Sequence, residues 1–243
     1  MVSIRENVLR VREAIQKAAQ GVGRKPDEIR LVAASKTVDV DRIRAAIEAG
    51  ITIFGENYVQ EARKKIEAIE KPVLWHFIGH LQSNKAKYAV KLFEMVQSVD
   101  SIGLAEELNR RAERVDRKIK VLVEVNLSGE SSKWGVTEEG SVSLICRINE
   151  LENLRFRGLM TMPPYFDDPE ESRPYFVRLW KLGKRVVDEK IHPGPLELSM
   201  GMSNDFLVAI QEGATLVRVG TAIFGARPST DTADGYPDGF ERS

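Results

Sequence analysis

Eight short apolar runs rich in β-branched residues alternate along the chain with longer segments of helical period. The runs lie at 30–35, 51–54, 73–78, 95–99, 120–126, 155–161, 195–199 and 215–219. Between them, apolar residues recur every three or four positions, as in Phe176, Leu179 and Leu182, which is the spacing of one helix face. Strict alternation of strand and helix predicts a parallel sheet with helices outside. Eight such units most simply close into a single α/β domain, a (β/α)8 TIM-type barrel.

The two ends of the chain depart from an ideal eightfold repeat. Ile4, Val8, Val11 and Ile15 predict an amphipathic helix over residues 4–20. After the last strand only "GTAIFGARP" and a turn-rich tail remain. We therefore expect the first helix to fill part of the outer ring. An open doubly wound sheet is the alternative, but it normally has fewer strands and a glycine-rich first turn, whereas the first turn here reads "SKTVDV".

These patterns predict a barrel domain over residues 1–228 and a flexible tail over 229–243. The 36 basic and 36 acidic residues cancel, so no nucleic acid or membrane surface is indicated as a partner, and a small neutral or zwitterionic ligand fits better. No run approaches the ~18 apolar residues of a membrane span. Cys146 is the only cysteine and lies in a helical pattern, where a buried apolar thiol is expected. A cytoplasmic protein is predicted.

Polar residues gather where the predicted strands end, which is the end at which barrel proteins bind their ligands. They are Lys36, Asn57, His80, Asp100, Asn126, Thr161, Ser199, Gly220 and Thr221. Lys36 closes the apolar run "LVAASK". A lysine at the rim of an apolar core loses hydration, which favours a neutral amine able to attack a carbonyl. The structural alternative is a solvated lysine at a strand end.

The loops after the seventh and eighth strands predict a phosphate site, as is frequent in this fold. Ser199 offers a hydroxyl, Gly201 allows close backbone approach, and Gly220 with Thr221 opens one helical turn whose N–H groups can face an anion. Ordinary turn glycines are the alternative for each loop alone. Ser203 and Asn204 are expected to cap a helix over 205–212.

Arg218 stands between two valines in "LVRVG". Period-2 alternation turns Leu216 and Arg218 toward the barrel interior, where a guanidinium needs a partner. Glu124 or Glu197 could supply it, and a structural ion pair and a role toward a ligand remain equally open.

The histidines and tryptophans considered next are interpreted as packing or rim residues and not as metal ligands. His76 and His80 have the i, i+4 spacing of zinc ligands on helices, but His76 lies in a predicted strand and no acidic residue nearby completes a triad. No metal site is therefore expected. His80 is interpreted as a rim residue, His76 as an interior one, and the three tryptophans Trp75, Trp134 and Trp180 as packing residues.

A reactive amine, a phosphate seat on the far side of the same rim and an arginine between them describe a pyridoxal 5′-phosphate (PLP) pocket. The segments "LVAASKTVDVDRIRAAIEAGITIFGENYVQEARKK", "WHFIGHLQSNKAK" and "ELSMGMSNDFLVAIQEGATLVRVGTAIFGARP" closely resemble the pyridoxal-phosphate homeostasis protein family, relatives of the barrel domain of alanine racemase. The resemblance runs from the first helix to Pro228. It implies a Schiff base on Lys36. It also implies a set of further cofactor-binding residues, which are Asn57, His80, Ser199, Gly201, Arg218, Gly220 and Thr221.

Three functions stay open at this stage. The first is a carrier that holds PLP reversibly, without robust turnover, in cofactor and amino-acid homeostasis, with apo PLP-dependent enzymes as possible partners and a monomeric state. The second is an amino-acid racemase or lyase using Tyr58, His80 or Lys36 as base. The resemblance weakens it, because alanine racemase carries an additional β-domain with an opposing acid/base, and no C-terminal β-domain is expected here. The third is a cofactor-free Schiff-base enzyme like a class I aldolase.

Overall fold

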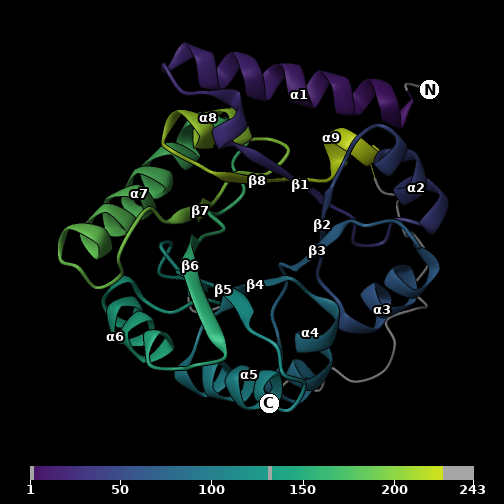
Figure 1. Cartoon of the computed structure of the whole chain (residues 1–243). Coiled ribbons are helices and arrows are strands. Elements are labelled where there is room, and N and C mark those ends of the chain that lie inside the picture. Colours follow the sequence, from purple (N-terminus) through teal and green to yellow (C-terminus); the bar gives the residue numbers. More distant parts are fainter. Residues whose placement is uncertain (1–2, 131–132, 227–243) are drawn as a thin grey trace.

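In a computed structural model, residues 3–130 and 133–226 are described, and they form the predicted closed barrel of eight parallel strands in the order β1 to β8 (Figure 1). The predicted tail at 229–243 lies outside the described residues. The strands are β1 (Arg30–Ala34), β2 (Ile53–Glu56), β3 (Leu74–Phe77), β4 (Met95–Val99), β5 (Ile119–Glu124), β6 (Leu154–Met160), β7 (Glu197–Ser199) and β8 (Leu216–Val219).

Helices follow the strands and surround the barrel (Figure 1). They are α1 (Ile4–Gly21), α2 (Val40–Glu48), α3 (Val59–Ala68), α4 (Ala86–Leu92), α5 (Ile102–Glu113), α6 (Glu138–Asn149), α7 (Arg173–Asp188), α8 (Phe206–Gln211) and α9 (Thr221–Phe224). Three short 3-10 turns complete the described elements, at Pro26–Glu28, Ser83–Lys85 and Pro169–Ser172. No helix in these two described stretches is both long and apolar enough to cross a membrane.

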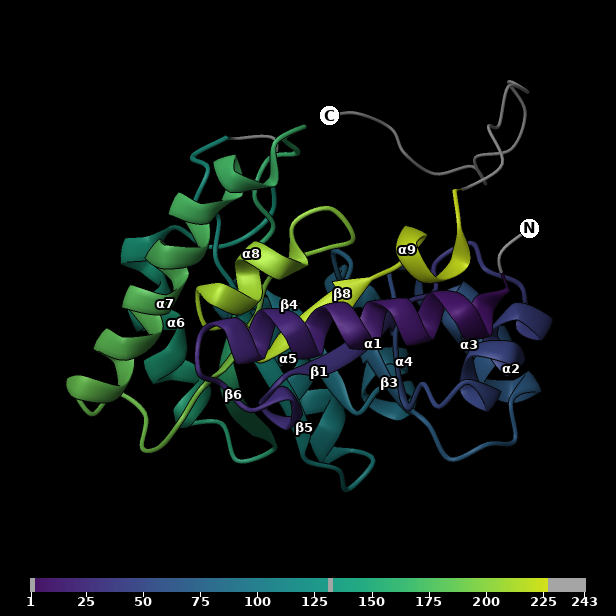
Figure 2. The same ribbon diagram turned by 90° about the horizontal axis from the view of Figure 1, so that it is seen from above.

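The helix α1 occupies the place in the outer ring predicted for it. It starts with a capping box, in which the Glu6 amide donates to Ser3 Oγ and the Ser3 amide donates to the Glu6 carboxylate. It contacts α2, α8 and α9 and runs across the outside of β1 and β8 (Figure 2). The side-chain amide of Asn7 in α1 donates from Nδ2 to Ile223 O at 2.9 Å. Because α9 has only four residues, α1 covers much of the surface that a full eighth helix would cover.

The strand β2 starts and ends two residues later than the apolar run 51–54 predicts. Gly50, at φ 91°, ends the preceding helix, and the Ile51 amide still donates to Ala46 O of that helix. At its other end, β2 includes Glu56, which is completely buried. A buried carboxylate looks polar in the sequence, and only a partner far along the chain makes it compatible with a strand interior.

The barrel interior has an apolar layer and, above it toward the carboxyl ends, a polar one. The apolar layer consists of Val32, Ile53, Met95, Leu122, Met160 and Leu216. Two residues farther along their strands, Gln97, Glu124 and Arg218 also point inward because side chains alternate across a strand. The predicted inward direction of Leu216 and Arg218 is therefore confirmed, while Val217 and Val219 pack outward against the helices.

Three packing predictions are wrong. Cys146 is exposed on α6, because the inner face of that helix is formed by Ser141, Leu144, Ile145 and Ile148. Trp134 and Trp180 are 55% and 44% exposed. Trp75 alone of the tryptophans is a packing residue, with its ring centroid 5.2 Å from that of Phe54.

Candidate cofactor site at the carboxyl ends of the strands

Lys36 and Gly220 lie at the ends of neighbouring strands. The last strand pairs with the first, with Ala33 opposite Val219. A Cβ atom on Gly220 would stand 3.1 Å from Ala34 O, so the turn after β8 packs directly against the end of β1. Lys36 is half-buried two residues beyond that end. The expectation of a seat on the far side of the rim is therefore wrong, because closure of the barrel makes β1 and β8 neighbours.

Two backbone N–H groups of the turn after β8 converge on one oxygen. Gly220 N and Ala222 N donate to Ser203 Oγ at 3.1 and 3.3 Å. Ser203 belongs to the loop after β7, so the loops after the last two strands meet at this point, which we call the anion seat (Gly220, Ala222 and Ser203). Donors that converge in this way suit an oxygen of an anion. Thr221 lies in the same turn and is exposed.

The predicted helix caps at Ser203 and Asn204 are wrong. Asp205 occupies the cap position of α8 without a side-chain hydrogen bond to the helix. Its carboxylate instead accepts from Met202 N at 2.6 Å. The side-chain Nδ2 of Asn204 donates to Phe166 O at 2.9 Å. Ser203 is thereby available to the turn after β8, a role that local capping rules could not reveal.

Two of the predicted phosphate residues have strong structural roles below the rim. Ser199 is completely buried, and its hydroxyl makes hydrogen bonds within the polar layer. Gly201 has φ 88°, and a Cβ atom there would come within 2.5 Å of Ala209 Cβ and 2.9 Å of Phe206 Cα. Glycine at 201 is therefore required for α8 to pack on the barrel.

A chain of hydrogen bonds crosses the polar layer from β8 to β3. Arg218 Nη1 donates to Ser199 Oγ at 2.6 Å, and Ser199 Oγ donates to Gln97 Oε1 at 2.6 Å. Gln97 Nε2 then lies 2.9 Å from His76 Nδ1. Burial lowers the pKa of His76 to about 3, with Arg30 and Lys120 adding to the effect. His76 is thus neutral, and its Nδ1 accepts from the Gln97 amide.

Arg218 is buried and finds its hydrogen-bond partners in neutral groups. Besides Ser199, it donates from Nη2 to Thr161 O at 2.9 Å. The expected partner Glu197 instead forms ion pairs with Arg30 and Arg157. A guanidinium with good neutral acceptors keeps its charge inside the barrel at an acceptable desolvation cost.

The second expected partner, Glu124, interacts with Arg218 through charge. Burial and, after it, the charge of Asp100 raise the pKa of Glu124 to about 7, against the opposing effect of Arg218. Burial lowers the pKa of Arg218 to about 10, against the effect of Glu124 and Asp205. Arg218 is therefore a cation at neutral pH, and Glu124 titrates near neutrality.

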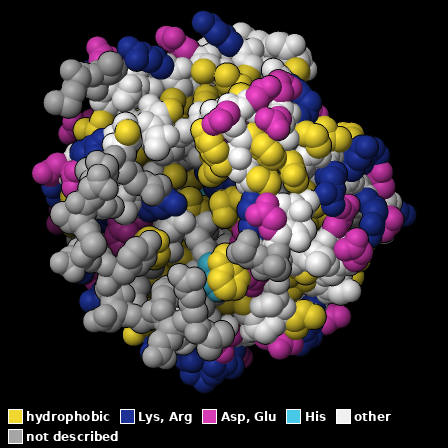
Figure 3. Space-filling view, turned by 180° about the vertical axis from the view of Figure 1, so that it is seen from behind, with side chains coloured by type: hydrophobic (Ala, Val, Ile, Leu, Met, Phe, Trp, Pro, Cys, Tyr) yellow, Lys and Arg dark blue, Asp and Glu magenta, His cyan; other side chains and the backbone are white. Residues whose placement is uncertain are grey.

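Asn57 and His80 complete the rim. A Cβ atom on Gly79 would come within 2.6 Å of Asn57 O, so glycine at 79 lets the ends of β2 and β3 approach closely. His80 Nδ1 lies 3.4 Å from Asp100 Oδ2. Its ring stacks on Trp134, with centroids 3.4 Å apart and planes at 11°. The face seen in Figure 3 has a hollow near its middle.

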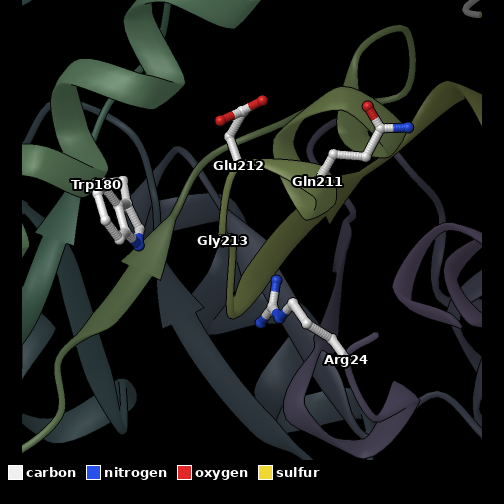
Figure 4. A pocket seen from close by; sticks show the side chains of 5 residues that line it. All are labelled: Arg24, Trp180, Gln211, Glu212 and Gly213. Atoms are coloured by element: carbon white, nitrogen blue, oxygen red, sulfur yellow. The ribbon is translucent and has the colours of Figure 1, made fainter. Parts of the chain in front are cut away.

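A separate cavity of about 470 Å³ lies where residues that precede β1 and β8 in the chain meet the helix α7 (Figure 4). It is lined by Arg24, Trp180, Gln211, Glu212 and Gly213. Arg24 donates to Ile210 O at 2.8 Å, and Glu212 pairs with Arg173. Its charged groups are already paired by the protein. Within residues 3–130 and 133–226, no group of three or more His, Cys, Asp or Glu could hold a metal ion.

Comparison with known proteins identifies the family of this chain. The family described as "Alanine racemase, N-terminal domain" matches residues 3–228. The pyridoxal phosphate homeostasis protein of Aquifex aeolicus is 46% identical over 223 residues, covering 91% of this chain and 97% of the relative. That of Vibrio alginolyticus is 41% identical over 232 residues, covering 93% and 99%.

Solved structures extend the comparison. PipY from Synechococcus elongatus, determined with PLP bound, has a TM-score of 0.82 at 34% identity and covers 92% of this chain and 100% of its own. An alanine racemase from Clostridium difficile has a TM-score of 0.67 at 16% identity, which concerns the fold alone, and the match covers 92% of this chain and 61% of the racemase. The chain belongs to the alanine racemase N-terminal domain family and, within it, to the pyridoxal phosphate homeostasis proteins.

Proposed function

We propose that this protein binds PLP reversibly, as a Schiff base on Lys36, and takes part in intracellular PLP and amino-acid homeostasis. The observation that carries the proposal is the position of Lys36 and the anion seat at the ends of the neighbouring strands β1 and β8. The names of the relatives and the PLP-bound PipY support it. When bound, PLP supplies an aldehyde that condenses with a primary amine with loss of one water.

The residues of the rim fit a PLP molecule in defined roles. The N–H groups of Gly220 and Ala222 and the hydroxyl of Ser203 would hold the phosphate, with Thr221 beside them. Ser199 and Gly201 would support this seat from below. Lys36 would provide the amine, and Asn57 and His80 would line the ring.

Arg218, which Ser199 and Thr161 hold in place, would lie near the pyridine nitrogen. A permanent cation at that place disfavours protonation of the ring nitrogen, which makes the ring a poorer electron sink. A Schiff base that stays exchangeable with other amines therefore suits storage and delivery better than turnover. On this account the partners are apo PLP-dependent enzymes, and the protein acts as a cytoplasmic monomer.

Titration of the purified protein with PLP tests the proposal against its alternatives. We expect a yellow complex, loss of its visible band in Lys36→Ala, and retention in Lys118→Ala, which removes an exposed lysine before β5. Binding without any visible band would contradict the Schiff base. Chiral analysis of alanine and serine after long incubation separates the carrier from a racemase, and vigorous racemisation would overturn the proposal. A protein that condenses with a sugar phosphate but not with PLP would be the aldolase-like alternative.

A further inference from the structure

A buried ion cluster lies directly behind the loop that carries Lys36. Lys65 of α3 is 5% exposed. Its Nζ donates to Glu56 Oε1 at 2.8 Å, to Glu61 Oε1 at 2.6 Å and to Ser35 O at 2.6 Å. An ammonium group has three N–H donors, and each has an acceptor here. Lys65 is therefore fixed in place and is not itself available as an attacking amine.

The cluster binds the backbone on both sides of Lys36. On one side, Lys65 holds Ser35 O, and Ser35 Oγ donates to Glu56 Oε1 at 2.5 Å. On the other side, the amide of Thr37 donates to Glu61 Oε1 at 2.6 Å. Lys36 is thus the middle residue of a three-residue loop whose two neighbours are tied to the same cluster.

Thr37 adopts a backbone conformation that a threonine does not take without support. Its φ is 63°, in the left-handed region that β-branched side chains disfavour strongly. Such a conformation persists where the surrounding contacts determine it. Its amide hydrogen bond to Glu61, which Lys65 holds through Oε1, is such a contact.

We propose that Lys65 is a positioning residue, which holds the Lys36 loop so that the Lys36 side chain faces the anion seat. This inference rests on the proposed function. Burial raises the pKa of Glu56, and the charge of Lys65 opposes that shift. Without Lys65, two carboxylates would be left together behind the loop with no cation between them, and the loop would relax away from this conformation.

The test compares Lys65→Met with Lys64→Met, the same change at an exposed neighbouring position of α3. We expect the visible PLP band to form between about tenfold and a hundredfold more slowly in Lys65→Met, since small misplacements of a reacting group have effects of that order. Lys64→Met should behave as the wild type. Equal rates in both variants would refute the positioning role.

A second variant keeps the proposal testable if Lys65→Met does not fold. Glu61→Ala removes the acceptor of the Thr37 amide from a partly exposed side chain, and Glu67→Ala is its control on the exposed face of α3. We expect Glu61→Ala to slow band formation by about threefold to tenfold, a smaller effect because Lys65 keeps two of its three bonds. An unchanged rate would contradict the proposal.

Hydrogen–deuterium exchange without PLP separates this inference from the proposed function. In the cofactor-free protein, the peptide that contains residues 35–37 should exchange at least several-fold faster in Glu61→Ala than in Glu67→Ala. If the wild-type protein forms no visible band but the two variants differ in exchange, the proposed function fails, and the inference that the ion cluster holds the Lys36 loop stands. If the band forms at the same rate in every variant and exchange is unchanged, the function stands and the inference fails.

Discussion

Replacing Glu124 by glutamine tests the electrostatics of the polar layer inside the barrel. Glu124 is buried at the end of β5, and the charges of Asp100 and Arg218 both act on it. Glutamine keeps the size and the acceptor oxygen of the side chain but cannot ionise. The difference in unfolding free energy between wild type and Glu124→Gln therefore reports the cost of ionising this one carboxyl, and contributions from other titrating groups, such as His76, cancel.

The magnitude follows from the pKa. Burial raises the pKa of Glu124 from 4.5 to about 7 in the folded protein. Between these two values the folded state binds the proton and the unfolded state does not, so the stability of the wild type falls as pH rises. At 1.36 kcal/mol per pKa unit, the wild type loses about 3 kcal/mol relative to Glu124→Gln between pH 4.5 and pH 8.

Urea denaturation at several pH values measures this difference directly. We expect the free-energy gap in favour of Glu124→Gln to widen with pH and to level off above pH 7. Glu67→Gln, the same change at an exposed position of α3, is the control for the substitution itself. A constant gap for Glu124→Gln, or one that narrows as pH rises, would refute the argument that burial controls this carboxyl.

Three other changes probe the site. Ser203→Ala removes a hydroxyl that would contact the phosphate, and should weaken PLP binding by about 1 kcal/mol, roughly fivefold by equilibrium titration. Unchanged affinity would show that Ser203 does not contact the phosphate. Gln97→Leu leaves His76 Nδ1 and the Ser199 hydroxyl without Gln97 as their partner. It should lower the free energy of unfolding, measured by urea denaturation, by about 1–3 kcal/mol. A variant as stable as the wild type would show that the hydrogen-bond chain contributes nothing to stability. Trp134→Ala removes an exposed ring and should change the free energy of unfolding by less than about 0.5 kcal/mol. It should also shift the NMR resonances of the His80 ring protons, and unchanged resonances would rule out the stacking of His80 on Trp134.

Local periodicity predicts the strands and helices that carry this site. Alternation in "LVRV" predicts the inward direction of Arg218. The alternation of strands and helices predicts the eight strands and the rim on which Lys36 and Gly220 lie. Both signals are set by residues within a few positions of each other, because strand and helix periods are local properties of the backbone.

The partners of the site residues depend on contacts between distant parts of the chain. Ser199 and Gln97 are 102 residues apart, and Lys65 reaches Ser35 across 30 residues. The role of Ser203 also depends on a distant contact. Local rules predict a helix cap, but its hydroxyl accepts hydrogen bonds from backbone N–H groups 17 and 19 residues further along the chain. Gln97 is a signal of the polar layer that the sequence contains. It is a polar residue in the apolar run "MVQSV", two positions after the inward-facing Met95.

Trapping of the bound cofactor is the most direct test of the claim that PLP binds to Lys36. The wild-type protein is incubated with PLP and reduced with borohydride, and its peptides are mapped by mass spectrometry. We predict a phosphopyridoxyl group on Lys36 alone. A group carried by Lys65 or by any other lysine, or no group at all, would contradict a binding site built between the end of β1 and the turn after β8.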